Sequence, residues 1–573
     1  MKKRFVCAIL AVSMIGMLMT GCGSESSDTS LRKSARSASK RTEAEYKEEP
    51  AEEPVQESAQ EPTREAGVNS AKEVSDMPDV CMEDCAEYEH YNDFSNEKYN
   101  SINENGYMSA KTSPLSTFAA DVDTASYSNF RRFVTAGYGL NDFPADALRT
   151  EEMVNYFTYD YEDPRGEVFG VNAEISDCPW NEDAKLMMLG INTAELNSRN
   201  VPNSNIVFLV DVSGSMYDSN KLPLIQQSME LLMDSFDEDD RISIVTYAGD
   251  VSVVLNGERG NNKRKIMRAF NKLEAGGSTN GGDGIVLAYE VARDNFIEDG
   301  VNRVIICTDG DFNVGLTSQA ELEDLISEEK ESGVFLSVLG FGMYNYSDAN
   351  METLADKGNG NYAYIDTLSE AKKVLVDEMT STFVTVAKDV KLQVEFNPAL
   401  VSEYRLVGYE NRTMAAEDFT DDTKDGGEMG AGHQVTAIYE IFLADEANKA
   451  LSNLKYQDTT VSKKGAQADE YCTLSIAYKE PDGQKSKYLE FPIGRENYTK
   501  RPSDNYIFAT SVAELSLALR NSEYLKIDNM SALYEAGERA NMVKNPDSYQ
   551  EEFIELIEEI ADNDSYVEDY VIE

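Results

Sequence analysis

The stretch Asp211-Val212-Ser213-Gly214-Ser215 places one carboxylate and two hydroxyls at alternate positions along the chain. Oxygen ligands of this kind suit hard divalent cations such as Mg²⁺, Mn²⁺ or Ca²⁺. The five residues before them, Ile206 to Val210, are all apolar, and such a run predicts a strand buried on both faces of a parallel sheet. Ligands in open α/β sheets bind beyond the carboxyl ends of the strands, so this stretch predicts a cation site at that edge.

Two further stretches should open at the same edge of the sheet. Gly276-Gly277-Ser278-Thr279-Asn280 is a glycine-flanked loop that leads into a predicted helix. Thr308-Asp309-Gly310 directly follows the apolar run Val304–Cys307. Because the βα loops of parallel strands lie on one side of a sheet, all three stretches are expected to meet.

The elements that position these loops alternate between strand and helix from residue 203 to about 385. The predicted strands are Ile206–Val210, Ile242–Tyr247, Val251–Leu255, Arg303–Cys307, Val334–Phe341 and Tyr362–Ile365. An amphipathic stripe from Leu222 to Phe236, with Pro223 in its first turn, predicts the first helix. The alternation predicts an α/β fold with a doubly wound, mostly parallel sheet. The interval between Tyr247 and Val251 is too short for a crossover helix, so these two strands should form an antiparallel edge hairpin.

The order Asp-x-Ser-x-Ser, threonine, Thr-Asp-Gly resembles the von Willebrand factor type A (VWA) domain and its metal-ion-dependent adhesion site. The resemblance implies that Ser213, Ser215 and Thr279 supply hydroxyl oxygens and that Asp211 and Asp309 act directly or through water. Octahedral geometry needs about six oxygens, so at least one position stays open to water or to a partner's carboxylate. Mg²⁺ is the preferred cation, with Mn²⁺ and Ca²⁺ as alternatives.

The flanking segments resemble the companion domains of a bacterial VWA lipoprotein subfamily. The stretches that carry this likeness are Ser116–Tyr127, Arg149–Phe157 and Cys178–Trp180 on the N-terminal side, and Tyr404–Arg412 and Gly432–Glu440 on the C-terminal side. Strict alternation in Val390–Phe396 and Gln434–Ile441 predicts antiparallel strands. We expect strands from both flanks to share one β-rich body, followed by C-terminal helices between Phe508 and Ile560. A helix over Leu368–Phe383 is predicted to join the VWA sheet to the C-terminal strands, and Asp121 and Asp123 are predicted to cap the first companion helix.

The N-terminus reads as a lipoprotein leader and a tether. Lys2-Lys3-Arg4 precedes an apolar run that is too short to span a bilayer. The run ends in Leu18-Met19-Thr20-Gly21-Cys22, which resembles a lipobox and implies acylation of Cys22 after cleavage. The next ~90 residues are poor in large apolar side chains and are predicted to be disordered. The expected domains are therefore a signal peptide (1–22), an acidic linker (23–112), an N-terminal companion domain (113–200), the VWA domain (201–385) and a C-terminal companion domain (386–573).

Composition narrows the classes of function. The chain carries 104 acidic and 52 basic residues, a formal charge of −52, which argues against a nucleic-acid partner. Its two histidines, His90 and His433, leave almost no material for a Ser-His-Asp triad or a histidine-rich zinc site. Of its seven cysteines, Cys81 and Cys85 are closely spaced, but whether they pair stays open.

Three functions therefore stay open, and the first is preferred. The chain would be a non-enzymatic protein, lipid-anchored at the extracytoplasmic face of the cell membrane, that binds an acidic side chain of a partner protein through its cation. The second is an envelope-assembly scaffold in which the cation is structural. The third is a metal-assisted hydrolase, which would have to use a glutamate as its base.

Overall fold

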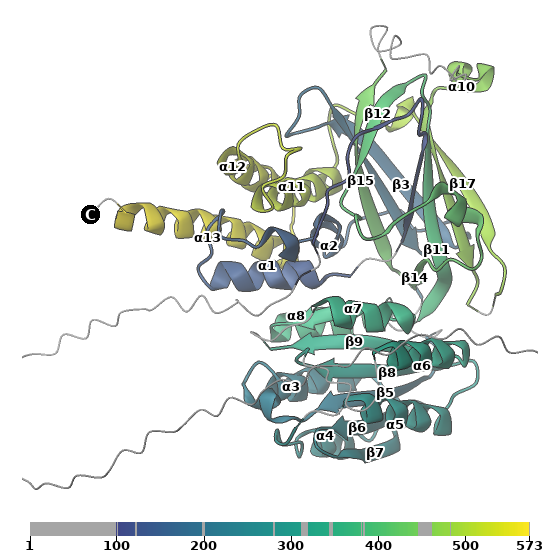
Figure 1. Cartoon of the computed structure of the whole chain (residues 1–573), viewed down its shortest axis with the longest axis vertical. Coiled ribbons are helices and arrows are strands. Elements are labelled where there is room, and N and C mark those ends of the chain that lie inside the picture. The colour runs from purple at the N-terminus through teal and green to yellow at the C-terminus, as the bar shows by residue number, and fades with distance from the viewer. Residues whose placement is uncertain are drawn as a thin grey trace, which may run out of the picture. The chain divides into compact units, whose positions relative to one another are not determined.

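β5 (Ser204–Asp211) lies inside a six-stranded sheet with the order β10-β9-β8-β5-β6-β7 (Figure 1). Its alternate residues enter different cores, with Ile206 and Phe208 on one face and Val207 and Leu209 on the other. Every residue of the strand is buried. A strand covered on both faces needs a continuous apolar run, which is why this segment does not alternate with polar residues. The predicted α/β class with a doubly wound sheet is confirmed.

The remaining strands of this sheet are β6 (Arg241–Tyr247), β7 (Val251–Arg259), β8 (Val301–Thr308), β9 (Phe335–Phe341) and β10 (Tyr362–Ile365). β6, β8, β9 and β10 join β5 in parallel register. β7 pairs antiparallel with β6 at the end of the sheet. The short interval before Val251 thus produces the predicted edge hairpin.

Helices cover both faces of the sheet. α3 (Leu222–Leu232), α4 (Lys263–Phe270) and α8 (Leu368–Lys372) contribute to one core, and α5 (Gly281–Asp294), α6 (Gln319–Glu331) and α7 (Asp348–Lys357) contribute to the other. The helix predicted over Leu368–Phe383 is confirmed only in part, because it does not stay α-helical. α8 ends at Lys372 and continues as a π-helical turn, Lys373–Asp377, in which the Glu378 N–H donates to the Lys373 carbonyl five residues earlier. This turn buries Val374 and Leu375 against the sheet.

The companion strands form two antiparallel sheets packed face to face. One sheet has the order β1-β12-β15-β4-β3, and the other has the order β13-β2-β11-β16-β17 with β14 paired to β11. Their bounds are β1 Met108–Ser109, β2 Leu115–Ala119, β3 Phe169–Asp177, β4 Lys185–Thr193, β11 Thr385–Phe396, β12 Val401–Val407, β13 Thr413–Met414, β14 Gly427–Gly430, β15 Gln434–Leu443, β16 Glu470–Lys479 and β17 Lys487–Gly494. Phe118 and Leu392 of one sheet share a core with Leu189 and Tyr439 of the other. Strands from before and after the VWA sheet therefore form one β-rich body, as predicted.

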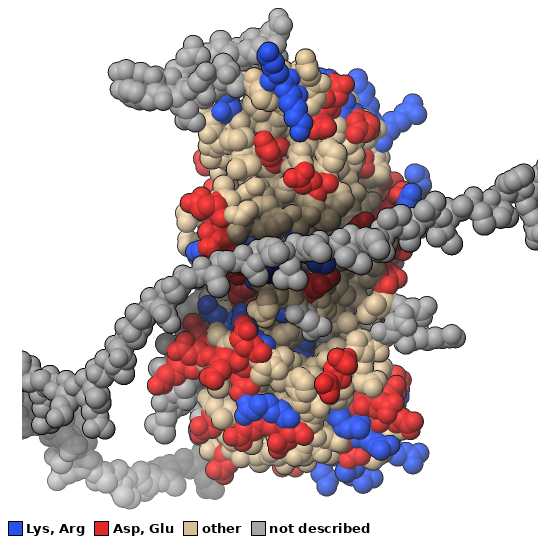
Figure 2. Space-filling model, turned by 90° about the vertical axis from the view of Figure 1, so that its right-hand side faces the viewer, with Lys and Arg blue, Asp and Glu red and all other residues tan. Residues whose placement is uncertain are grey.

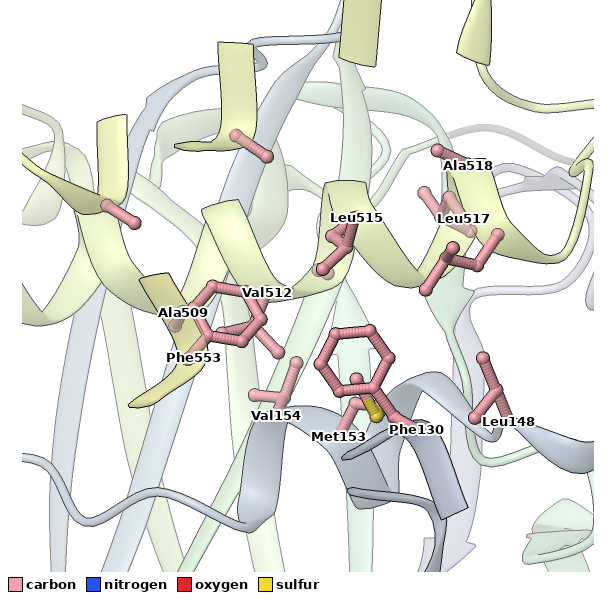
Figure 3. Close-up of a cluster of buried hydrophobic side chains, with 14 of the residues drawn as sticks. Phe130, Leu148, Met153, Val154, Ala509, Val512, Leu515, Leu517, Ala518 and Phe553 are labelled. Atoms are coloured by element: carbon pink, nitrogen blue, oxygen red, sulfur yellow. The ribbon is translucent and has the colours of Figure 1, made fainter. Parts of the chain in front are cut away.

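A helical layer packs beside the five-stranded sheet. It consists of α1 (Ala125–Thr135), α2 (Thr150–Asn155), α11 (Asp504–Leu519), α12 (Asn529–Ala540) and α13 (Ser548–Val571), and a short α10 (Lys463–Gln467) lies apart from it. Figure 3 shows Phe130 of α1, Val154 of α2, Val512 of α11 and Phe553 of α13 gathered in one cluster. The N-terminal and C-terminal companion segments are thus held together by apolar burial.

Polar contacts join this helical layer to the VWA sheet domain. Arg131 of α1 bonds to Asp366 and Glu370, which flank the start of α8. Asp123 does not cap α1 as predicted. The N-cap of α1 is Thr124, which makes no side-chain cap bond, and Asp123 accepts hydrogen bonds from the Tyr362 N–H at 3.0 Å and from Arg412 at 3.1 Å. Asp121, the other predicted cap, lies outside the described residues.

The computed structural model describes residues 99, 101–120, 123–196, 201–278, 281–310, 319–342, 348–379, 381, 384–444, 461–481 and 483–571. All of them belong to one compact unit that starts at Glu89. Within these ranges no helix combines the length and the apolar character needed to cross a bilayer. The predicted leader, the predicted acylation site Cys22 and the cysteines Cys81 and Cys85 lie outside them.

Candidate metal centre

The carboxyl edge of the parallel sheet brings the first predicted loop and Asp309 together. Asp211 is the last residue of β5, and Asp309 directly follows β8, the neighbouring parallel strand. Ser213 and Ser215 lie in the tight turn that leaves β5, where a 3-10 helix spans Gly214–Tyr217. Because β5 and β8 run in parallel, both carboxylates lie at the same end of the sheet.

Asp211 is a fully buried carboxylate with one oxygen satisfied. Its Oδ1 accepts a hydrogen bond from the Ser213 N–H at 2.8 Å, whereas its buried Oδ2 makes no hydrogen bond of normal geometry to a described residue. Burial raises the pKa of Asp211 to about 6, although bonds from Ser213 partly oppose this shift. A buried, unpartnered carboxylate oxygen is costly in a folded protein, and a bound cation would remove that cost.

Two hydroxyls lie next to this carboxylate. The Oγ atoms of Ser213 and Ser215 are 2.9 Å apart, and Ser213 is buried whereas Ser215 is exposed. The group therefore runs from a buried carboxylate to a hydroxyl at the protein surface. Such an arrangement offers hard oxygen ligands on the protein side and leaves the outer side open to solvent.

The glycine loop is bonded directly to this turn. The Gly276 N–H donates to the Val212 carbonyl at 2.8 Å, and the Gly214 N–H donates to the Gly277 carbonyl at 3.1 Å. Gly277 has a φ of +90°, a conformation that residues with a Cβ rarely adopt. These bonds bring the backbone before Thr279 against the Ser213–Ser215 turn. Thr279 itself lies outside the described residues, so its predicted role as a ligand stays a prediction.

Lys221 is a member of the site that the sequence analysis missed. Its buried Nζ donates to the Ser215 carbonyl at 3.0 Å and to Asp309 Oδ2 at 2.9 Å, so one ammonium bridges the two loops. The sequence did contain a signal. Lys221 is the N-cap of α3, where Ser, Thr, Asp or Asn is usual and where a positive charge opposes the helix dipole.

The donor set fits a divalent cation and does not resemble a zinc site. Among the residues that the structure describes, no group of three or more His, Cys, Asp or Glu side chains is placed to hold a metal. The candidate ligands are instead Asp211, Ser213, Ser215 and Asp309, with Thr279 predicted next to them. The unpartnered Oδ2 of Asp211 beside paired hydroxyls is the observation that supports this fit.

Comparisons with known proteins match most of the chain. Family models match at residues 93–188 (von Willebrand factor), 205–378 (von Willebrand factor type A domain) and 381–562 (uncharacterized protein YfbK, C-terminal). The uncharacterized protein YfbK of Escherichia coli (strain K12) is 42% identical over 469 residues, which cover 80% of each chain.

Solved structures also match. The von Willebrand factor type A protein from Catenulispora acidiphila is 14% identical, with a TM-score of 0.38, and the match covers 70% of this chain and 91% of that chain. A second match is proximal thread matrix protein 1 from the mussel byssus, whose metal-ion-dependent adhesion site (MIDAS) motif is occupied by zinc. It is 22% identical, with a TM-score of 0.27, and the match covers 33% of this chain and 46% of that chain.

The match to the relative from Escherichia coli spans four fifths of both chains and includes the companion segments as well as the parallel sheet. The chain therefore belongs to the von Willebrand factor type A family, in the group that carries the YfbK C-terminal domain.

Proposed function

We propose that this chain binds a partner protein through a divalent cation held at the end of its parallel sheet. Asp211, Ser213, Ser215, Thr279 and Asp309 would provide the protein ligands, and Mg²⁺ is the preferred ion. The proposal rests above all on Asp211, whose buried Oδ2 makes no hydrogen bond of normal geometry to a described residue and whose carboxylate lies next to the Ser213–Ser215 turn.

The shape of the site favours a ligand that approaches from solvent. Asp211 and Ser213 are buried, whereas Ser215, Gly276 and Gly277 are exposed. A cation held between them would keep positions open on its outer side, where an acidic side chain of a partner could coordinate. VWA domains commonly bind protein partners, which agrees with this use of the site.

The net charge of the whole chain also favours a contact in which the cation binds an acidic side chain of the partner. Acidic and basic side chains are interspersed on the face shown in Figure 2, but the complete sequence carries a formal charge of −52. A carboxylate that approaches such a protein is repelled unless a bound cation reverses the local charge. The same net charge disfavours nucleic acid as a partner.

We further propose that Cys22 is acylated and anchors the protein at the extracytoplasmic face of the cell membrane. The lipobox-like stretch that ends in Cys22 supports this placement. Cells expressing the wild type should incorporate labelled palmitate into the protein and retain it in the membrane fraction. The Cys22→Ser variant should lose the label and the membrane retention, and a variant that keeps both contradicts the anchor.

A metal-dependent pull-down tests the binding function. Wild-type protein should capture its partner from membrane extract in Mg²⁺ and release it in EDTA, whereas Asp211→Ala should capture nothing above background. Asp218→Ala is a suitable control, because Asp218 is an exposed carboxylate just beyond the same turn. If Asp211→Ala captures the partner as well as the wild type does, the proposed function is wrong.

The same experiment separates the alternatives. A metal-induced rise in the melting temperature without metal-dependent capture would favour the structural scaffold. We favour binding over hydrolysis because His433, the histidine that the structure describes, directly precedes β15 of the sandwich and is not among the residues of the site. Ester or peptide turnover that disappears in Asp309→Ala would reverse that preference.

A further inference from the structure

We propose that Lys221 is a built-in counter-charge that weakens cation binding by the protein alone and thereby makes the cation depend on an acidic ligand. The inference rests on the proposed function, since it concerns the same site. It assigns Lys221 a role as a positioning residue that acts on the ligands through charge.

The contacts of Lys221 place its ammonium between two parts of the site. Nζ bonds to Asp309 Oδ2 at 2.9 Å and to the Ser215 carbonyl at 3.0 Å. The side chains of Lys221 and Asp309 are only 7% and 1% exposed, so solvent screens this ion pair weakly. Asp309 is therefore engaged by a positive charge of the protein itself.

The balance of charge explains the consequence for a bound ion. Asp211, Asp309 and Lys221 together carry one net negative charge when all three are ionised. A divalent cation would turn this into one net positive charge in a partly buried place. A carboxylate from a partner restores neutrality, so cation binding and partner binding should strengthen each other.

Two local features of the fold, the N-cap of α3 and the backbone at Gly342, are unusual and accommodate Lys221. A lysine at the N-cap of α3 opposes the helix dipole and forms no side-chain cap bond. The loop after β9 also makes room for it, because a Cβ added at Gly342 would collide with Lys221 Cε. Gly342 has a φ of +89°, so glycine suits both the space and the backbone. Two independent local features thus accommodate one buried ammonium.

Removal of the charge should change two properties in opposite directions. In Lys221→Met, the buried Asp309 carboxylate loses its ion pair with Lys221, so the melting temperature in EDTA should fall by about 5 °C or more. The same loss removes repulsion of the cation, so binding of Mg²⁺ or Mn²⁺ alone, measured by calorimetry, should tighten about tenfold. If Lys221 had a purely structural role, its replacement would lower both the melting temperature and the affinity for the metal.

Three matched variants define the result. Lys221→Gln keeps a hydrogen-bond donor without the charge and should also bind the metal more tightly. Lys221→Arg keeps the charge and should bind within about threefold of the wild type. Lys272→Met removes an exposed charge four residues before Gly276 and should change neither property. If a variant is too unstable for calorimetry, the rise in its melting temperature across a metal titration gives the affinity instead.

The outcomes distinguish this inference from the proposed function. If the wild type and the Lys221→Met and Lys221→Gln variants all fail to bind Mg²⁺ and Mn²⁺, both ideas are overturned. A wild type that binds the metal, together with Lys221→Met and Lys221→Gln variants that bind it equally or more weakly, overturns the role of Lys221 alone. Tighter binding by both neutral variants, with the arginine variant unchanged, supports it.

Discussion

At the scale of single residues, Asp211 is a buried carboxylate that lowers the stability of the fold and can serve as a metal ligand. Its carboxylate is buried, its Oδ2 makes no hydrogen bond of normal geometry to a described residue, and burial raises its pKa to about 6. An apolar or neutral residue here would suit the fold better than an ionised one. Costs of this kind concentrate at functional sites, because only the function requires them.

Replacement of Asp211 by asparagine should therefore stabilise the protein and abolish the site. Asparagine keeps an acceptor for the Ser213 N–H but carries no charge, so the free energy of unfolding in EDTA should rise by about 1–3 kcal/mol. The rise in melting temperature caused by Mg²⁺ should disappear in this variant. Thermal unfolding with and without Mg²⁺ checks both expectations, and an asparagine variant less stable than the wild type contradicts the first.

The residues of the site differ in how far the sequence could predict them. Asp211, Ser213 and Ser215 follow an unbroken apolar strand, and neighbouring parallel strands bring Asp309 to the same edge. Lys221 directly precedes the helix predicted from Leu222, but an unusual residue at an N-cap does not by itself indicate a metal site. The pairing of one ammonium with one particular carboxylate across 88 positions depends on the folded chain.

At the scale of elements, the buried Arg131 links α1 to the VWA domain and to α13. Arg131 bonds twice to Asp366, at 2.8 and 2.7 Å, once to Glu370 at 2.7 Å and once to Glu552 of α13 at 2.8 Å. Burial raises the pKa of Glu370, and the Arg131 charge opposes that shift. Three elements therefore depend on the same guanidinium.

Arg131→Met should destabilise the protein by about 3–5 kcal/mol, because it leaves buried carboxylates without their cation. The double variant Arg131→Met/Glu370→Gln should recover part of this loss, since it removes one of the stranded charges. Urea unfolding of the single and double variants measures the coupling. Arg165→Met serves as a control, because the Arg165–Glu162 pair is 87% and 78% exposed and should contribute less than about 1 kcal/mol.

Strands and helices could be predicted where apolar residues recur at a regular spacing. They were hard to predict where a buried charged residue interrupts that spacing. β11 and β15 alternate strictly and were predicted, but β12 (Val401–Val407) was missed. In β12, Arg405 is fully buried and pairs with Glu440 of β15 at 3.1 Å. A charged residue in a core satisfies its needs through a partner distant in sequence, so the local pattern alone suggests an exposed segment. The π-helical turn after α8 likewise depends on what it packs against.

At the scale of the whole molecule, the two companion segments meet across the inserted VWA domain. Glu151 of α2 comes before the insertion, and Glu410, just after β12, follows it. Each has a buried Oε2 without a hydrogen-bond partner among the described residues. Burial, followed by the nearby charge of Glu410, raises the pKa of Glu151 to about 7. The contact between the two segments is therefore best held when Glu151 carries a proton.

Stability should accordingly depend on pH through Glu151. Its pKa is about 7 in the folded chain and near 4.5 when unfolded, so the folded state keeps a proton that the unfolded chain releases between these values. The stabilising contribution is complete below pH 4.5 and is lost as the pH rises to about 7. Glu151→Gln cannot lose this proton and should be more stable than the wild type at pH 8 by about 2 kcal/mol, with the difference shrinking toward pH 5. Urea unfolding at fixed ionic strength measures this difference.

Glu514, whose pKa is also about 7, still titrates in both proteins, so some pH dependence should persist in the variant. The exposed Glu162→Gln is the matched control, and a Glu151→Gln difference that is the same at pH 5 and pH 8 would show that no proton is held between the two segments.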